Sequence, residues 1–136
     1  MIEIGAFPFL YKKDKLHIIL ITITSGNAWI LPKGKPEDDM SKAQVAKLES
    51  FEEAGIRGKI IDKKLREEFK RDDGGTLIIY PLHIEKVLDK WQEQSFRKRK
   101  LVSIKEALEM VTKTEYLAAI EYFSDADFIK KFKHKS

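Results

Sequence analysis

Residues 29–56 read WILPKGKPEDDMSKAQVAKLESFEEAGI, a loop rich in glycine, proline and charge followed by a segment of helical character. Ser41 and Gln44 have the spacing of a capping box, in which each residue satisfies a free amide at the start of a helix. Gly55 tolerates the left-handed conformation that commonly ends a helix. The stretch therefore predicts a loop over 33–39 and a helix from about residue 42 to residue 54.

Three glutamates near the end of this predicted helix share one face, because Glu49, Glu52 and Glu53 are spaced i, i+3 and i+4. Like charges at this spacing cost roughly a few tenths of a kcal/mol per pair, and a helix C-terminus disfavours negative charge. The opposite side of the helix carries the small residues Ala43, Ser50 and Ala54. They predict a helix that lies close on a sheet and turns its carboxylates outward. Spacing alone leaves two interpretations, a solvated acidic face or a site for a hard divalent cation such as Mg²⁺.

The length of 136 residues, with 43% hydrophobic and 35% charged residues, is typical of one soluble globular domain. No apolar run approaches the roughly 20 residues that cross a bilayer, and the N-terminus lacks the pattern of a signal peptide. The lack of cysteine excludes disulfides and thiol catalysis, and we expect a cytoplasmic location. The positive charge, +4 net, gathers in runs such as 97–100 and 130–135, which either suit a polyanion or are solvated surface.

Alternating and β-branched segments predict a sheet, and later segments with helical spacing predict helices on its faces. The expected strands are 5–11, 16–24, 29–31, 58–71, 76–87 and 101–104, with a hairpin turn at 72–75. The expected helices after the first are 104–111, 115–123 and 125–133. Aromatic residues with helical spacing near the C-terminus are expected in the core: Tyr116, Tyr122, Phe123, Phe128 and Phe132.

The opening stretch resembles the signature of the Nudix hydrolases, which reads G-x5-E-x7-R-E-U-x-E-E-x-G-U with U an aliphatic residue. Gly34 matches the first glycine, Glu49 the glutamate of the RE pair, Glu52 and Glu53 the EE pair, and Gly55-Ile56 the end. The resemblance implies an α/β fold, a Nudix-like α/β/α sandwich with a mixed β-sheet between helices. One domain would span 1–136, with a core of about 5–123 and a basic C-terminal helix or tail at 124–136.

By the same resemblance, the metal ligands would be Gly34, Glu49, Glu52 and Glu53, and the cofactor Mg²⁺ or Mn²⁺. The reaction would be hydrolysis of a phosphoanhydride bond, with Glu53 or Glu49 as the general base that takes the proton of the attacking water.

Three positions depart from the signature, because Met40 replaces its first glutamate, Leu48 its arginine and Ser50 its aliphatic residue. The change of an acid and a base to Met40 and Leu48 has two readings. It is either a joint replacement of an ion pair by an apolar contact, or the mark of a binding or regulatory module with weakened catalysis.

Beyond the signature, the chain is similar to the diphosphoinositol polyphosphate and diadenosine polyphosphate hydrolases over residues 5–123, including the stretch 87–111. The implied partner is a phosphorylated small molecule: a nucleoside diphosphate-X, a dinucleoside polyphosphate or a diphosphoinositol polyphosphate. Candidate phosphate contacts, with solvated surface as the alternative for each, are Lys33, Lys35, Arg97 and Arg99. We expect no nucleic-acid partner, since aromatic and basic residues do not interleave, and we expect a monomer or homodimer without membrane contact. His17, His83 and His134 form no ligand or triad constellation.

Overall fold

The computed structural model describes residues 1–133, so His134 and the end of the predicted basic tail lie outside the described residues. Its centre is an eight-stranded mixed sheet with the strand order β3-β2-β1-β7-β5. These strands are β3 (Trp29–Ile30), β2 (Lys15–Thr22), β1 (Ile2–Lys12), β7 (Thr76–Val87) and β5 (Ile56–Ile60). Three shorter strands pair at the sides: β4 (Lys33–Gly34) with β1, β6 (Glu67–Lys70) with β7, and β8 (Arg99–Ser103) with β2.

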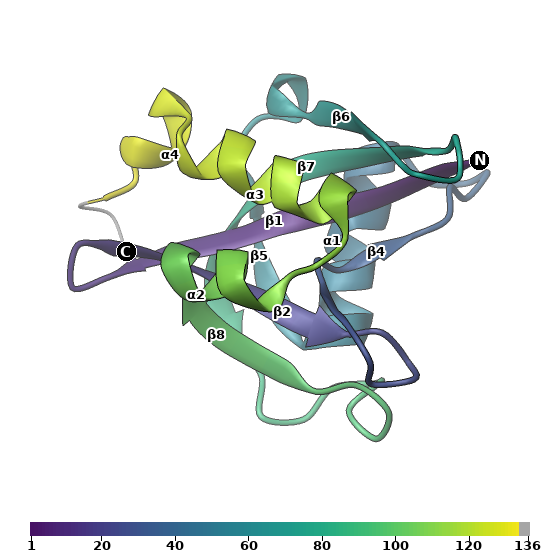
Figure 1. The fold of residues 1–136 in the computed structure, drawn as a ribbon, viewed down its shortest axis with the longest axis horizontal. Coiled ribbons are helices and arrows are strands. Elements are labelled where there is room, and N and C mark those ends of the chain that lie inside the picture. Colours follow the sequence, from purple (N-terminus) through teal and green to yellow (C-terminus); the bar gives the residue numbers. More distant parts are fainter. Residues whose placement is uncertain (134–136) are drawn as a thin grey trace.

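The two central strands, β1 and β7, run parallel, and the other pairs are antiparallel. Both central strands are nearly continuous runs of buried residues, as a strand covered on both faces requires. Figure 1 shows α1 (Lys42–Ala54) on one face and α2 (Ile104–Met110) and α3 (Thr114–Ser124) on the other, with α4 (Asp127–Lys130) after α3. The predicted α/β/α sandwich is therefore confirmed.

Several predicted bounds need correction. The segment 58–71 is not one strand, because Asp62 accepts a hydrogen bond from the amide of Lys64 and starts a 3₁₀ turn, η1 (Lys63–Leu65), between β5 and β6. The predicted loop at 33–39 begins with strand β4, in which Lys33 pairs with Gly5 of β1. The last helix is shorter than 125–133. The helix 42–54, the strand 76–87 and the hairpin between β6 and β7 are confirmed.

Aromatic residues join α3 to the sheet, as predicted for most of the group. Tyr116 and Phe123 are buried, and Phe123 stacks on Phe7 of β1 with ring centroids 5.3 Å apart. Tyr122 was expected in the core and is instead 42% exposed, with its ring packed edge-on against Phe69 of β6. Among residues 1–133, no helix is long and apolar enough to cross a membrane.

Candidate active site

Both ends of α1 are fixed as its sequence predicts. Ser41 and Gln44 exchange the two hydrogen bonds of a capping box, at 2.7 and 3.2 Å. Gly55 has φ 65° and donates its amide hydrogen to the carbonyl of Phe51, which ends the helix. The helix therefore holds its last turn, with the glutamates, in one defined place against the sheet.

The carboxylates do not form an outward face, which corrects one prediction. Glu53 is 5% exposed and belongs to the packed side of α1, while Glu49 and Glu52 are half-buried. Buried small residues bring that side of the helix close to the sheet: Ala43, Ala46, Ser50 and Ala54. Ser50 fits there because its hydroxyl donates to the carbonyl of Ala46 at 2.8 Å.

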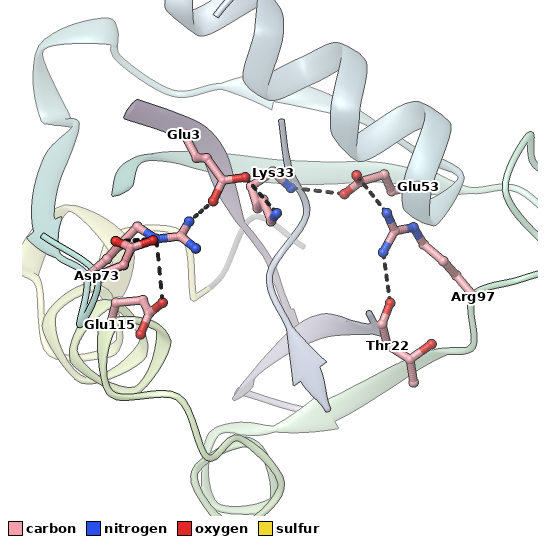
Figure 2. Close-up of polar contacts among 8 residues, drawn as sticks. Glu3, Thr22, Lys33, Glu53, Asp73, Arg97 and Glu115 are labelled. Carbon is pink, nitrogen blue, oxygen red and sulfur yellow. Dashed lines mark hydrogen bonds and ion pairs between the residues drawn. The ribbon is translucent and has the colours of Figure 1, made fainter. Parts of the chain in front are cut away.

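Glu53 receives one hydrogen bond on each carboxylate oxygen (Figure 2). The backbone amide of Lys33 donates to Oε1 at 3.0 Å, and Nη2 of Arg97 donates to Oε2 at 3.1 Å. The first bond comes from β4 and the second from the segment before β8, so two elements distant in sequence hold one carboxylate. Each oxygen keeps a second lone pair for another partner.

Glu49 lies against Gly34, the first residue of the signature. A methyl group built on Gly34 would lie 2.6 Å from Cγ and 2.7 Å from Oε1 of Glu49, so only glycine leaves room for this carboxylate. The negative charge of Glu49 also acts on Glu53, whose pKa it raises. Gly34 and Glu49 are therefore in contact, and Glu53 accepts a hydrogen bond from the residue that precedes Gly34.

Burial and like charge oppose ionisation of this carboxylate pair. Burial raises the pKa of Glu53 to about 8, against the amide of Lys33 and the charge of Arg97, which lower it. Burial, followed by the charge of Glu52, raises the pKa of Glu49. Two adjacent carboxylates whose ionisation is opposed are a donor set in which a divalent cation can take the place of a bound proton.

The metal set predicted from the signature is only partly assembled. Within residues 1–133, no three histidine, aspartate or glutamate side chains converge as a ready-made metal cluster. Glu49 and Glu53 converge beside Gly34, and their carboxylate oxygens suit a hard cation. Glu52 contributes charge to Glu49, while its own carbonyl accepts a hydrogen bond from the amide of Glu93. The four-residue metal site stays a prediction, with Glu49 and Glu53 as the pair that fits.

Lys33 contributes to the site through its backbone, while its side chain turns the other way. Its Nζ lies 2.7 Å from Oε2 of Glu3, which is buried and also pairs with Arg71. Arg71 in turn lies near Glu115 of α3, at 3.9 Å. Figure 2 shows these charges as a chain running away from Glu53. The predicted phosphate contact by Lys33 is untested, and the ion pair with Glu3 disfavours it.

The basic run 97–100 divides by strand alternation into inward arginines and outward lysines. Arg97 and Arg99 are half-buried, and Lys98 and Lys100 are exposed. Arg99 stacks over the ring of Trp91 at 3.9 Å, and its Nη1 donates to the carbonyl of Ala54 at 2.8 Å. The arginines therefore bind the end of α1, which disfavours their predicted role as phosphate contacts. Lys35, the remaining predicted contact, is exposed.

Sequence reasoning missed three residues that shape this site: Thr22, Trp91 and Glu93. The carbonyl of Thr22 accepts from Arg97 at 2.9 Å, and Glu93 pairs with Arg97 at 2.6 Å. The alternation of Arg97 and Arg99 within a strand-like segment was the available signal, because alternate residues of a strand share a face.

Met40 and Leu48, the two apolar departures, have separate apolar surroundings. Met40 packs against the core, and Leu48 lines a cavity of about 390 Å³ with Phe51, Ile56 and Leu82. Whether the two replace an ion pair jointly stays a prediction.

Relatives of known family share most of this chain. Nudix hydrolase 16, mitochondrial, of Arabidopsis thaliana is 31% identical over 124 residues, covering 77% of this chain and 69% of the relative. Nudix hydrolase 21, chloroplastic, of the same plant is 32% identical, covering 88% and 64%. Diphosphoinositol polyphosphate phosphohydrolase 3-beta of Bos taurus is 28% identical, covering 74% and 64%. The chain thus spans about two-thirds of the length of these relatives.

Solved structures share the fold at lower identity. A C. elegans Ap4A hydrolase binary complex superposes with a TM-score of 0.74 at 17% identity, covering 90% of this chain and 95% of that one. The Nudix domain of Shewanella oneidensis NrtR, complexed with ADP ribose, has a TM-score of 0.73 at 20% identity, covering 89% and 84%. No protein-family model matches the sequence. The coverage and identity of Nudix hydrolase 16 show that this chain belongs to the Nudix hydrolase family.

Proposed function

We propose that the protein is a divalent-metal-dependent hydrolase of a phosphoanhydride bond. The supporting observation is the Glu49–Glu53 pair beside Gly34, in which Glu53 is buried and Glu49 half-buried, so that a cation would neutralise charge that burial disfavours. The substrate class is a nucleoside diphosphate-X, a dinucleoside polyphosphate or a diphosphoinositol polyphosphate. The names of the bovine relative and the C. elegans structure contain two of these classes.

In this proposal Glu49 and Glu53 would hold Mg²⁺ or Mn²⁺, with Gly34 and Glu52 completing the set. The bound cation supplies charge neutralisation at the phosphates and acidifies the attacking water. Glu53, or Glu49 beside it, takes the proton of that water. The amide of Lys33 and the guanidinium of Arg97 keep the Glu53 carboxylate in one orientation, which lowers the entropic cost of the proton transfer.

Exposed lysines around the site provide positive charge for the substrate phosphates. Lys35 follows Gly34, and Lys98 lines a cavity of about 370 Å³ together with Thr24, Gln94 and Phe96. Arg97 also lines this cavity, which therefore adjoins the Glu53 carboxylate. A polyphosphate would extend from the carboxylate pair toward this cavity, where its remaining part would bind.

The second candidate is a binding module of the same fold that holds a phosphorylated ligand with weakened catalysis. The observation that favours it is the apolar pair Met40 and Leu48, which replaces the acid and the base of the signature. The NrtR domain was solved with ADP ribose, so a ligand of that kind belongs in any panel of ligands to be tested.

A cytoplasmic location and a monomer or homodimer stay predictions. Two of the relatives are named as chloroplastic and mitochondrial proteins.

The deciding experiment incubates purified protein with Mg²⁺ or Mn²⁺ and a panel of phosphorylated substrates. The panel holds dinucleoside polyphosphates, nucleotide sugars, ADP-ribose, damaged deoxynucleoside triphosphates and diphosphoinositol polyphosphates, and the products are separated by ion-exchange chromatography. We expect metal-dependent turnover that Glu53→Gln lowers by roughly 10²- to 10⁴-fold while the fold is retained. Tight binding without turnover of any substrate would favour the binding module instead.

A combined variant tests the role of the apolar pair. Met40→Glu with Leu48→Arg restores the residues of the signature at both positions. If the natural pair is a sufficient replacement, turnover stays within about threefold of the wild type. A sharp gain in turnover would identify Met40 and Leu48 as the cause of weakened catalysis.

A further inference from the structure

Arg97 is immobilised by three partners from three parts of the chain. Its Nη2 donates to Glu53 of α1 at 3.1 Å, its Nη1 to the carbonyl of Thr22 at the end of β2 at 2.9 Å, and its Nε to Glu93 at 2.6 Å. Only 11% of its side chain is exposed. Every nitrogen of the guanidinium therefore has an acceptor, and its charge is already paired with the carboxylates of Glu53 and Glu93.

The neighbouring contacts form a continuous attachment to the end of α1. The amide of Glu93 donates to the carbonyl of Glu52 at 3.1 Å, Arg97 binds the side chain of Glu53, and Arg99 binds the carbonyl of Ala54. Three consecutive residues of the helix are thus each held by the segment 93–99. We call this segment the helix clamp.

We propose that Arg97 is a positioning residue that orients Glu53 for the divalent cation, and that it is not a phosphate contact. This inference rests on the proposed function, because orientation of Glu53 matters only if that carboxylate binds the cation. The physical reason is that Arg97, itself held at three points, fixes Oε2 of Glu53 while the amide of Lys33 fixes Oε1, so the two contacts together set the plane of the carboxylate. Groups that orient a metal ligand commonly change metal affinity or activity by about 10- to 100-fold.

The presence of Leu48 leaves the arginine position of the signature without a positive charge in this chain. The position that carries arginine in the signature carries an aliphatic side chain here, and that side chain lines a cavity with Phe51 and Leu82. Among the described residues, Arg97 is the arginine whose side chain binds a glutamate of α1. A residue 44 positions away in sequence thus supplies the cationic partner of the last glutamate.

The test measures Mn²⁺ affinity by electron paramagnetic resonance on metal-free protein, so that it has a readout besides turnover. Arg97→Met removes all three hydrogen bonds, and Arg97→Lys keeps the charge but loses the planar fork. Arg57→Met is the matched control, because Arg57 is exposed on β5 and has no contact with the carboxylates. We expect Arg97→Met to weaken Mn²⁺ binding about 10- to 100-fold, Arg97→Lys to have a smaller effect, and Arg57→Met to have none.

Kinetics and a double-mutant cycle separate positioning from other roles. A positioning role lowers kcat and leaves KM within about threefold. It also predicts that Arg97→Met has little further effect on Mn²⁺ affinity in a Glu53→Gln background, because it acts through Glu53. If Arg97→Met does not fold, Arg97→Lys carries the same comparison.

Each contrary outcome has a distinct meaning. A rise in KM with unchanged Mn²⁺ affinity would make Arg97 a phosphate contact and overturn the inference. Unchanged Mn²⁺ affinity and kinetics with reduced stability would make it a structural residue only, and would also overturn it. A wild-type protein that neither binds Mn²⁺ nor turns over substrate would instead remove the proposed function.

Discussion

Arg99 closes the C-terminal end of α1 by donating its Nη1 hydrogen to the carbonyl of Ala54 at 2.8 Å. The same guanidinium stacks over Trp91 at 3.9 Å, so one side chain both satisfies a free helix carbonyl and fixes the helix clamp. The last turn of the helix, which carries Glu52 and Glu53, is thereby held by residues more than forty positions later in the chain.

Replacing Arg99 should therefore destabilise the protein. Arg99→Met loses the charged hydrogen bond and the stacking on Trp91, and we expect the free energy of unfolding to fall by about 1–2 kcal/mol in urea titrations. Lys100→Met removes the same charge from the adjacent exposed position and should have little effect on stability. Equal losses in the two variants would show that the cap contributes nothing.

Gly55 and Gly74 provide a second matched pair, since both have positive φ, at 65° and 86°. The methyl group of Gly74→Ala would have no atom within 4 Å. This variant should therefore lose only about 1 kcal/mol of unfolding free energy, from backbone strain. Gly55→Ala would also bring its methyl group within 2.8 Å of Cβ of Trp91 and 2.7 Å of Arg99. Thermal unfolding should therefore show at least twice the loss for Gly55→Ala. Equal losses of stability in the two variants would mean that Trp91 and Arg99 move away from the added methyl group without cost.

Gly34→Ala should act on function more than on stability. Its methyl group would displace the carboxylate of Glu49, and we expect Mn²⁺ affinity and kcat to fall by about 10- to 100-fold. Gly74→Ala, in a turn remote from the carboxylates, is the control and should leave both unchanged. A Mn²⁺ affinity of Gly34→Ala equal to that of the wild type would show that the contact between the Glu49 carboxylate and Gly34 is not needed for cation binding.

The raised pKa of Glu53 predicts how stability depends on pH. Because burial raises the pKa of Glu53 to about 8, the folded protein binds a proton that the unfolded chain has released. The unfolding free energy contributed by this group is therefore greatest at low pH and falls as pH rises from about 4.5 to 8. In EDTA we expect the Tm of the wild type to fall over this range relative to that of Glu53→Gln. Parallel curves for the two proteins would contradict the raised pKa.

The same pKa predicts the pH dependence of cation binding. A cation that takes the place of the proton binds more tightly as the proton becomes easier to remove, so Mn²⁺ affinity should rise from pH 6 to pH 8. The added Mn²⁺ should also release protons at pH 7, measurable in weakly buffered solution. An affinity independent of pH would show that the pair is already ionised in the folded protein.

The local sequence determined α1 completely, because its signals are all short-range. The capping box of Ser41 and Gln44, the left-handed Gly55 and the spacing of the glutamates act within a few residues of one another. The same holds for β7 and for the hairpin before it, where Gly74 turns the chain. The signature likewise brought Gly34 and Glu49 together, because a short loop joins β4 to α1.

Only the tertiary structure decided which way the glutamates face and what binds them. Sequence spacing placed three carboxylates on one helix face, but the depth of burial depends on how closely Ala46 and Ser50 let the helix approach the sheet. The partner of Glu53 is Arg97, which lies 44 residues away and reaches it because β8 pairs with β2. Charge in a basic run cannot reveal its acceptor from sequence, since an ion pair depends on distance in space and on burial.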